Sequence, residues 1–321
     1  ERGYAGTQSQ WAAITTRSGY FFVDKNSRKV FMMTDKLQDI GSLGLDNWFK
    51  DNLSFALEEL NIQTEITYLL NCIPDLYDNP IAGIGLTSVY DPKFKRILLT
   101  KRDKSPVNPT QFQLNLDAYQ LYLQTGVLVG NEIRFNCVLK KFQIWDPFAT
   151  HWSTMEWDDT YHFIASSWTI SYYPEFNLWC GFHDYVPYMY FNTSKNFYSF
   201  NDGNSNVWEH NSDTKGSFYG TVNPFEIEYI HNEFRESSGL VANFNYTLET
   251  FNPTNISVLE HGFTSFFIYN TFQLSEEENL EYLVNIRRTG NTWKVNKFRD
   301  MAAIAINTNA YYMEGTLLNP N

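Results

Sequence analysis

The densest group of carboxylates in the chain lies among tryptophans, in Glu156-Trp157-Asp158-Asp159, which follows Trp145-Asp146-Pro147. A glycoside hydrolase needs two carboxyl groups roughly 5 to 10 Å apart, as acid and as nucleophile or base. Tryptophan faces beside them would stack on sugar rings. Acidic turns between aromatic strands also occur in acidic β proteins without catalysis, so we favour a structural role. Glu156, Asp158 and Asp159 are candidate catalytic residues only under the alternative hypothesis of a glycan-binding or glycoside-hydrolase β-propeller.

The six histidines give no metal-ligating pattern, because none belongs to an HxxxH or HxH pair. His183-Asp184 and Glu209-His210 are adjacent pairs on expected strands. Neighbouring side chains on a strand point to opposite faces, so neither pair is arranged to cooperate. We therefore expect no metal ion.

The three cysteines, Cys72, Cys137 and Cys180, are far apart and odd in number. This favours buried free thiols over a disulfide framework or a zinc site. The chain also lacks the GxSxG, Walker A and GxGxxG motifs of hydrolases, P-loop enzymes and dinucleotide-binding proteins. The sequence therefore predicts no cofactor and no enzymatic activity.

Four stretches of the chain share one layout, in which an aromatic or β-branched strand meets a short polar turn and a second such strand follows. Pro fixes φ in such turns and Gly or Asn accepts positive φ, so each stretch predicts a β-hairpin. The 26 Phe, 21 Tyr and 9 Trp fit pleated surfaces and favour a mainly β fold. The hairpins are expected at 19–33, 84–100, 168–182 and 197–210.

Repeated hairpins are typical of β-propeller blades, and we favour a propeller-like arrangement over an ordinary β-sandwich. Two segments interrupt the hairpins. Apolar spacing in 46–61 predicts a short amphipathic helix, capped by Asp46, that docks onto the sheets or onto a neighbouring subunit. Residues 101–123 are polar and contain Pro, Gln and Asn, which suits a long insertion.

After Gly220 the sequence pattern changes to longer expected strands in which polar and apolar residues alternate, as in 225–230 and 244–248. We therefore expect a propeller-like hairpin domain over 1–222 and a second, sandwich-like β domain over 223–321. The chain begins at Glu1 without an initiator Met, and we interpret it as a fragment of a larger protein.

The chain carries 36 acidic and 24 basic residues, a formal charge of −12. An acidic surface repels phosphate groups, which argues against a DNA-binding regulator but suits a wall past which DNA slides. Basic residues cluster in 93–96 and 101–104. We favour the role of edge lysines that prevent unwanted strand pairing over contact with nucleic acid. No run approaches the ~20 apolar residues of a membrane helix, so we expect no membrane span.

Asn-X-Ser/Thr sequons leave open a third possibility, a secreted or cell-surface glycoprotein, although an Asn-rich sequence produces such triplets by chance. The sequons are at Asn52, Asn192, Asn245 and Asn255.

Four segments together resemble the muzzle or nozzle-type tail proteins of crAss-like and other short-tailed phages. They are Asp91–Lys101, Ser167–Tyr172, Asn206–Asn211 and Asn291–Asp300. In that family a β-propeller-like part and further β domains line and decorate the tail tube. The shared motifs are strand-and-turn signatures, so no catalytic residue carries over. This chain is much shorter than members of the family.

The resemblance implies a structural protein of the virion, located in the phage tail after assembly in the host cytoplasm. It implies copies of the chain in a symmetric ring around the DNA exit channel, next to other tail or portal-adjacent proteins. DNA would pass through without specific binding. A host-surface glycan is a further possible partner.

Overall fold

The computed structural model is mainly β, as the composition predicts, with many small antiparallel sheets and two α-helices among the described residues. The chain divides into two compact units, Glu1–Phe225 and Glu226–Asn321. The structure describes residues 5–58, 60–62, 78–81, 83–201, 205–211, 216–228, 243–252, 254, 256–258, 261–269, 273–274, 277–280, 284, 286–295 and 304–305.

The first unit begins with an antiparallel meander, which we call the N-terminal sheet. A 3-10 turn, η1 (Gln10–Ala12), precedes it. Its strands pair in chain order, and Phe22 lies opposite Phe31 in the first predicted hairpin. The strands are β1 (Ile14–Thr16), β2 (Gly19–Asp24), β3 (Lys29–Met33) and β4 (Leu37–Asp39).

The central sheet has the order β13-β12-β6-β5 and unites the second and third predicted hairpins. Strand β6 pairs with β12, with Leu99 opposite Ile170, although the arm described below separates them in sequence. The strands are β5 (Gly85–Asp91), β6 (Arg96–Arg102), β12 (Trp168–Tyr173) and β13 (Leu178–His183).

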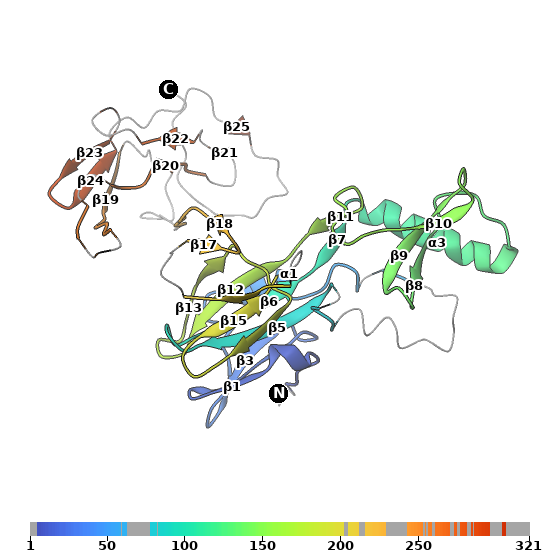
Figure 1. Ribbon diagram of the computed structural model, residues 1–321, viewed down its shortest axis with the longest axis horizontal. Helices are drawn as coiled ribbons and strands as arrows, with labels where there is room; N and C mark the ends of the chain where they lie inside the picture. Colours follow the sequence, from blue (N-terminus) through green and yellow to red (C-terminus); the bar gives the residue numbers. More distant parts are fainter. Residues whose placement is uncertain are drawn as a thin grey trace, which may run out of the picture. The chain divides into compact units, whose positions relative to one another are not determined.

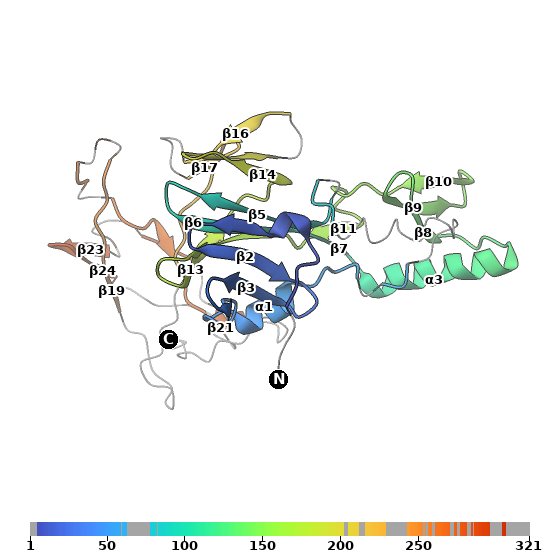
Figure 2. The ribbon, with the colours of Figure 1, turned by 90° about the horizontal axis from the view of Figure 1, so that it is seen from below.

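A third sheet, β14-β15-β16, contains the fourth predicted hairpin. Its strands are β14 (Met189–Asn192), β15 (Phe197–Phe200) and β16 (Val207–Glu209), and the short pair β17 (Ser217–Phe218) and β18 (Thr221–Val222) follows. The N-terminal, central and third sheets lie in successive layers, visible in Figure 2 as β2–β3, β5–β6 and β14–β16. No closed ring of blades is present in the part of the chain that the structure describes.

Two hydrophobic clusters hold these layers together. The larger one joins the N-terminal sheet to one face of the central sheet through residues such as Phe21, Val30, Leu99 and Ile170. The smaller one lies between the central and third sheets and consists of Val89, Leu98, Tyr185, Tyr190 and Phe197.

Helix α1 (Asp46–Asn52) docks onto the central sheet, as predicted. Phe49 is fully buried 4.9 Å from the Trp179 ring, and Trp48 lies 4.8 Å from Trp168. The helix is shorter than the predicted 46–61, because residues 53–58 form turns and bends. Asp46 makes no capping hydrogen bond; it pairs with Lys50 one turn later at 2.5 Å.

Residues 103–166 form an arm between β6 and β12 (Figure 1). The insertion expected between hairpins at 101–123 is present but has other bounds, because 101–102 end β6 and the inserted segment continues to residue 166; much of 103–123 is helix α3. Asn108 accepts a hydrogen bond from the Gln111 N–H, and Gly126 ends the helix at φ 72°. The arm contains β7 (Lys104–Pro106), α3 (Pro109–Thr125), β8 (Ile133–Asn136), β9 (Lys141–Asp146), β10 (His151–Thr154) and β11 (Phe163–Ala165).

The second unit has a three-stranded sheet with the order β19-β24-β23 over a core of Ile286, Trp293 and Val295. Strand β19 falls within the predicted 244–248. The strand expected at 225–230 is absent over 225–228, and residues 229–230 lie outside the described residues. The strands are β19 (Phe244–Thr247), β20 (Ser265–Phe266), β21 (Gln273–Leu274), β22 (Glu278–Asn279), β23 (Ile286–Thr289), β24 (Thr292–Val295) and β25 (Ile304–Ala305).

Candidate functional site

Buried and half-buried polar side chains lie where the central sheet meets the third sheet, instead of a continuous apolar surface. Side chains alternate along each strand, so every second residue of β5, β6 and β12 faces this layer. We call this group the polar layer. It comprises Thr87, Asp91, Arg96, Thr100, Thr169, Ser171, His183, Ser199, His210 and Tyr219.

The middle of the polar layer is a chain of hydroxyl groups. The Thr100 hydroxyl lies 2.8 Å from that of Thr169 and 2.6 Å from that of Tyr190, and Thr169 donates to the carbonyl of Tyr185 at 2.5 Å. Burial raises the pKa of Tyr190 well above its ordinary value. These hydroxyls therefore stay protonated and tie the third sheet to the central sheet.

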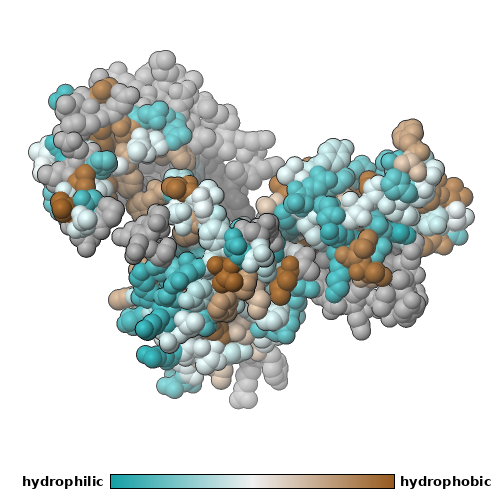
Figure 3. Space-filling model, in the orientation of Figure 1, coloured by the Kyte–Doolittle hydropathy of each residue, from teal (hydrophilic) through white to brown (hydrophobic). Residues whose placement is uncertain are grey.

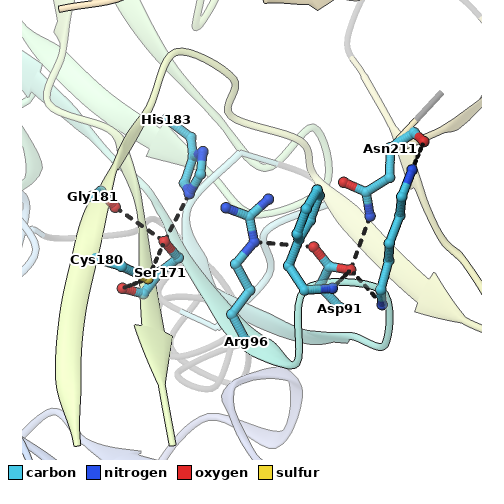
Figure 4. Close-up of polar contacts among 9 residues, drawn as sticks. Asp91, Arg96, Ser171, Cys180, Gly181, His183 and Asn211 are labelled. Atoms are coloured by element: carbon cyan, nitrogen blue, oxygen red, sulfur yellow. Dashed lines mark hydrogen bonds and ion pairs between the residues drawn. The ribbon is translucent and has the colours of Figure 1, made fainter. Parts of the chain in front are cut away.

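One end of the layer brings a serine, a histidine and a cysteine together (Figure 4). The Ser171 Oγ is 2.9 Å from the His183 Nε2 and 3.1 Å from the Cys180 Sγ. A β-bulge lets two residues, Cys180 and Gly181, lie opposite Ser171. Burial lowers the pKa of His183 to about 3, and the charge of Arg96 adds to this effect.

A second serine and histidine meet within the third sheet. The Ser199 Oγ lies 2.6 Å from the His210 Nε2 and 2.7 Å from the Tyr219 hydroxyl. His210 also stacks on Phe197, with ring centroids 4.4 Å apart. Burial, followed by Arg96, lowers the pKa of His210 to about 4, so the ring is neutral near pH 7.

An ion pair closes the layer at the β5–β6 turn. Asp91 is fully buried and accepts a hydrogen bond from the Arg96 Nε at 3.0 Å. Its other oxygen accepts from the backbone N–H groups of Lys93 and Phe94 and from the Asn211 side chain, at 2.9 to 3.3 Å (Figure 4). The carboxylate thus fixes its own turn and holds the end of the third sheet.

The Ser171–His183 contact has the connectivity of a nucleophile and its base, but its environment opposes that role. Ser171 is fully buried, so its hydroxyl does not reach solvent. A histidine with a pKa of about 3 is a weak base at neutral pH. The geometry therefore supports a structural contact between two neighbouring strands of the central sheet.

The acidic residues singled out from the sequence lie in the arm. Glu156 forms an ion pair with Lys141, and the side chain of Asp159 accepts a hydrogen bond from the Tyr161 N–H at 2.9 Å. Trp157, between them in sequence, packs on Phe163 with ring centroids 5.0 Å apart. Asp158 lies in the same turn. These contacts are those of a turn that is packed onto a hydrophobic core.

Asp146 belongs to a different turn, where its carboxylate accepts from the N–H groups of Phe148 and Ala149. These two hydrogen bonds lower its pKa. Trp145 packs against Trp152, with ring centroids 5.5 Å apart. Both motifs are thus held by local turn and strand contacts.

The basic clusters have partners that the sequence did not reveal. Lys95 pairs with Glu175 of the neighbouring hairpin at 2.8 Å. Lys101 and Asp103 form a buried pair at 2.7 Å, and Lys101 donates to the Ser54 carbonyl. The role of edge guard is wrong for Lys101, because β6 lies inside the central sheet.

The expectation of three buried free thiols is also wrong. Cys137 is disulfide-bonded, and Cys180 is free but exposed. Cys72, His231 and Asn255 lie outside the described residues. Of the remaining sequons, Asn192 and Asn245 are exposed.

Within the described ranges, no cluster of three or more His, Cys, Asp or Glu side chains is placed to hold a metal ion. No helix in the described part of the chain is both long and apolar enough to cross a membrane. No protein-family model matches the chain, and no curated protein is significantly similar to it.

The polar layer was missed in the sequence because Ser and Thr that alternate with apolar residues also fit a solvent-exposed strand face. A signal was present in the central hairpins. Asp91 and Arg96 flank one turn, Thr100 directly follows the apolar run 97–99, and Thr169 lies between Trp168 and Ile170. Such residues inside a sheet that is covered on both faces indicate a polar contact between layers.

Proposed function

We propose that the chain is a structural component of a phage tail, of the muzzle or nozzle type, and forms part of a ring of copies around the DNA exit channel. The observation that carries this proposal is a contact between two of the four segments that resemble phage tail proteins, the first (Asp91–Lys101) and the third (Asn206–Asn211). Asn211, from the third of them, donates to Asp91 of the first at 2.9 Å, and Lys93 donates to the Asn211 carbonyl at 2.8 Å. Residues in these two segments thus hold the central and third sheets together.

The other family-like segments are built into the sheets as well. Trp168 packs against α1, and the side chain of Trp293 is buried in the core of the second unit. Both tryptophans belong to segments that carry the resemblance, and both serve packing. This favours an architectural role over a catalytic one. We assign the polar layer to the same role.

We extend the proposal to a propeller-like arrangement in the assembled protein. Propeller blades are four-stranded antiparallel sheets that pack face to face. The N-terminal sheet is such a four-stranded meander, and it packs its apolar face on the central sheet. These features support blade-like units.

The partners in this proposal are copies of the chain, other tail or portal-adjacent proteins, and DNA that passes without specific binding. The formal charge of −12 supports the last point, because an acidic wall repels the phosphate backbone. Binding of a host-surface glycan would be an additional property. The location is the virion, after assembly in the host cytoplasm.

Electron microscopy and light scattering of the parent protein test this proposal. We expect closed rings, and antibodies raised against this chain should label the tails of the phage particles that contain it. A strictly monomeric parent protein, together with unlabelled particles, would refute the proposal.

A further inference from the structure

Helix α3 has a covered side and a bare side. On the covered side, Phe112 and Tyr119 are buried against the arm strands, with ring centroids 5.1 Å from Phe142 and 5.5 Å from Trp152. Leu116 is buried between them. This inner stripe anchors the helix to the rest of the arm.

The bare side carries a second stripe, which is mostly apolar and ends in a threonine. Leu114, Ala118, Leu121 and Thr125 are spaced by four, three and four residues, which places them on one side of the helix with the spacing of a coiled-coil contact. Leu114 and Leu121 are 56% and 52% exposed. Figure 3 shows hydrophobic residues among hydrophilic ones on the arm surface. We call this set the outer stripe.

The flanks of the outer stripe indicate what covers it. Asp117 is the single charged residue among the 17 residues of α3. The other side chains beside the stripe carry no charge, and the Gln111 side-chain amide donates to the Asn115 Oδ1 at 2.9 Å along the helix. A partner with complementary charges would find almost nothing to pair with. Two copies of a chain with a formal charge of −12 repel each other least where both surfaces are nearly uncharged.

We infer that the outer stripe binds the outer stripe of a second copy of this chain, with the two α3 helices antiparallel. The small Ala118 side chain leaves room for a leucine of the other copy. The helix leads outward along the arm (Figure 1), so an antiparallel pair keeps the two acidic bodies at opposite ends. Antiparallel pairing also brings the helix ends of opposite partial charge together.

This contact is self-complementary and joins copies two by two, whereas a ring needs a head-to-tail contact between different surfaces. The inference therefore goes beyond the proposed function. Its failure and the failure of the ring proposal give different results in the same measurements.

Leu121→Glu and Leu123→Glu form a matched pair of variants. Leu123 has a similar exposure, 47%, but continues the inner stripe on the opposite side of the helix. We expect Leu121→Glu to raise the dissociation constant of the pair by about tenfold or more, and Leu123→Glu to leave it unchanged. Analytical ultracentrifugation of the full chain measures this, and circular dichroism confirms that both variants fold.

Cysteine cross-linking tests the direction of pairing. A chain with Leu114→Cys, Thr125→Cys and Cys180→Ser should form dimers upon mild oxidation, with residue 114 of one copy linked to residue 125 of the other. Equal association of the Leu121→Glu and Leu123→Glu variants, or a wild-type chain that never pairs, would overturn the inference. Links from 114 to 114 would overturn the antiparallel direction. Rings that persist in Leu121→Glu would leave the ring proposal intact.

Discussion

Mild acid should destabilise the first unit through His183 and His210 of the polar layer. The folded chain keeps His183 and His210 neutral, with pKa values of about 3 and about 4, whereas the unfolded chain has ordinary histidines near 6.5. Between these values the unfolded state binds more protons. The free energy of unfolding is therefore unaffected above the ordinary pKa and falls as the pH drops below it.

The size of the loss follows from the gap between the pH and the ordinary pKa. At pH 5.5, one unit below 6.5, each buried neutral histidine lowers the free energy of unfolding by about 1.4 kcal/mol. His210 is nearly fully buried, but His183 is only half-buried, so solvent reduces its share. We expect a combined loss of about 2 to 3 kcal/mol between pH 7.5 and pH 5.5.

Urea unfolding followed by tryptophan fluorescence measures this loss in the first unit, because eight of the nine tryptophans precede residue 226 and only Trp293 follows it. A His183→Gln, His210→Gln double variant should lose most of the pH dependence, since glutamine does not titrate. His151→Gln is the matched control, because His151 bonds to Ser153 on an exposed strand. A double variant with the same pH dependence as the wild type would refute this reasoning.

Three further substitutions probe other contacts. Asp91→Ala should lower the free energy of unfolding by about 3 to 5 kcal/mol, because it leaves a partly buried guanidinium without its carboxylate. Glu175→Ala breaks an exposed ion pair and should lower the free energy of unfolding by less than about 1 kcal/mol. Equal losses for the two variants in urea titrations would contradict this expectation. Phe49→Ala should cost about 3 to 5 kcal/mol by opening a cavity under α1, and an unchanged midpoint would disprove the docking role. Glu156→Gln should leave glycan-array binding and glycosidase assays at the wild-type level; a wild-type activity that the variant loses would support the glycan hypothesis instead.

The hairpins were predictable because their information is local. At the β2–β3 and β5–β6 hairpins, polar turn residues adjoin aromatic and β-branched strands, and each strand finds its partner within a few residues. The layering of the sheets depends on contacts between distant segments. No local sequence pattern indicates that β6 pairs with β12.

Helix α3 escaped prediction because its composition resembles that of a loop. Its four glutamines, its asparagine and its single charged residue hide an apolar pattern that lies on two sides of the helix. Its ends were nevertheless marked, since Asn108-Pro109 is a typical start and Gly126 a typical end of a helix. Helix α1 was predicted too long, because the apolar residues that continue its spacing beyond Asn52 lie in turns that pack into the same core.

The candidate carboxylates were placed in turns by sequence reasoning, and they lie there. The polar layer was not foreseen, because the burial of Asp91 and Ser171 requires a third sheet over the central one. A single strand does not show whether its polar face meets water or another sheet.

The ribbon of β7 and β11 at the base of the arm has a mechanical consequence. These strands pair with each other, with Lys104 opposite Ala165, and their chain segments continue into β6 and β12 at the middle of the central sheet. A pull on the arm along the ribbon would slide β6 past β5 and β12 past β13. Hydrogen bonds in antiparallel sheets lie across the strands, so all of them would share the force at once instead of breaking one after another. The arm is thus attached in the direction in which a sheet best resists tension.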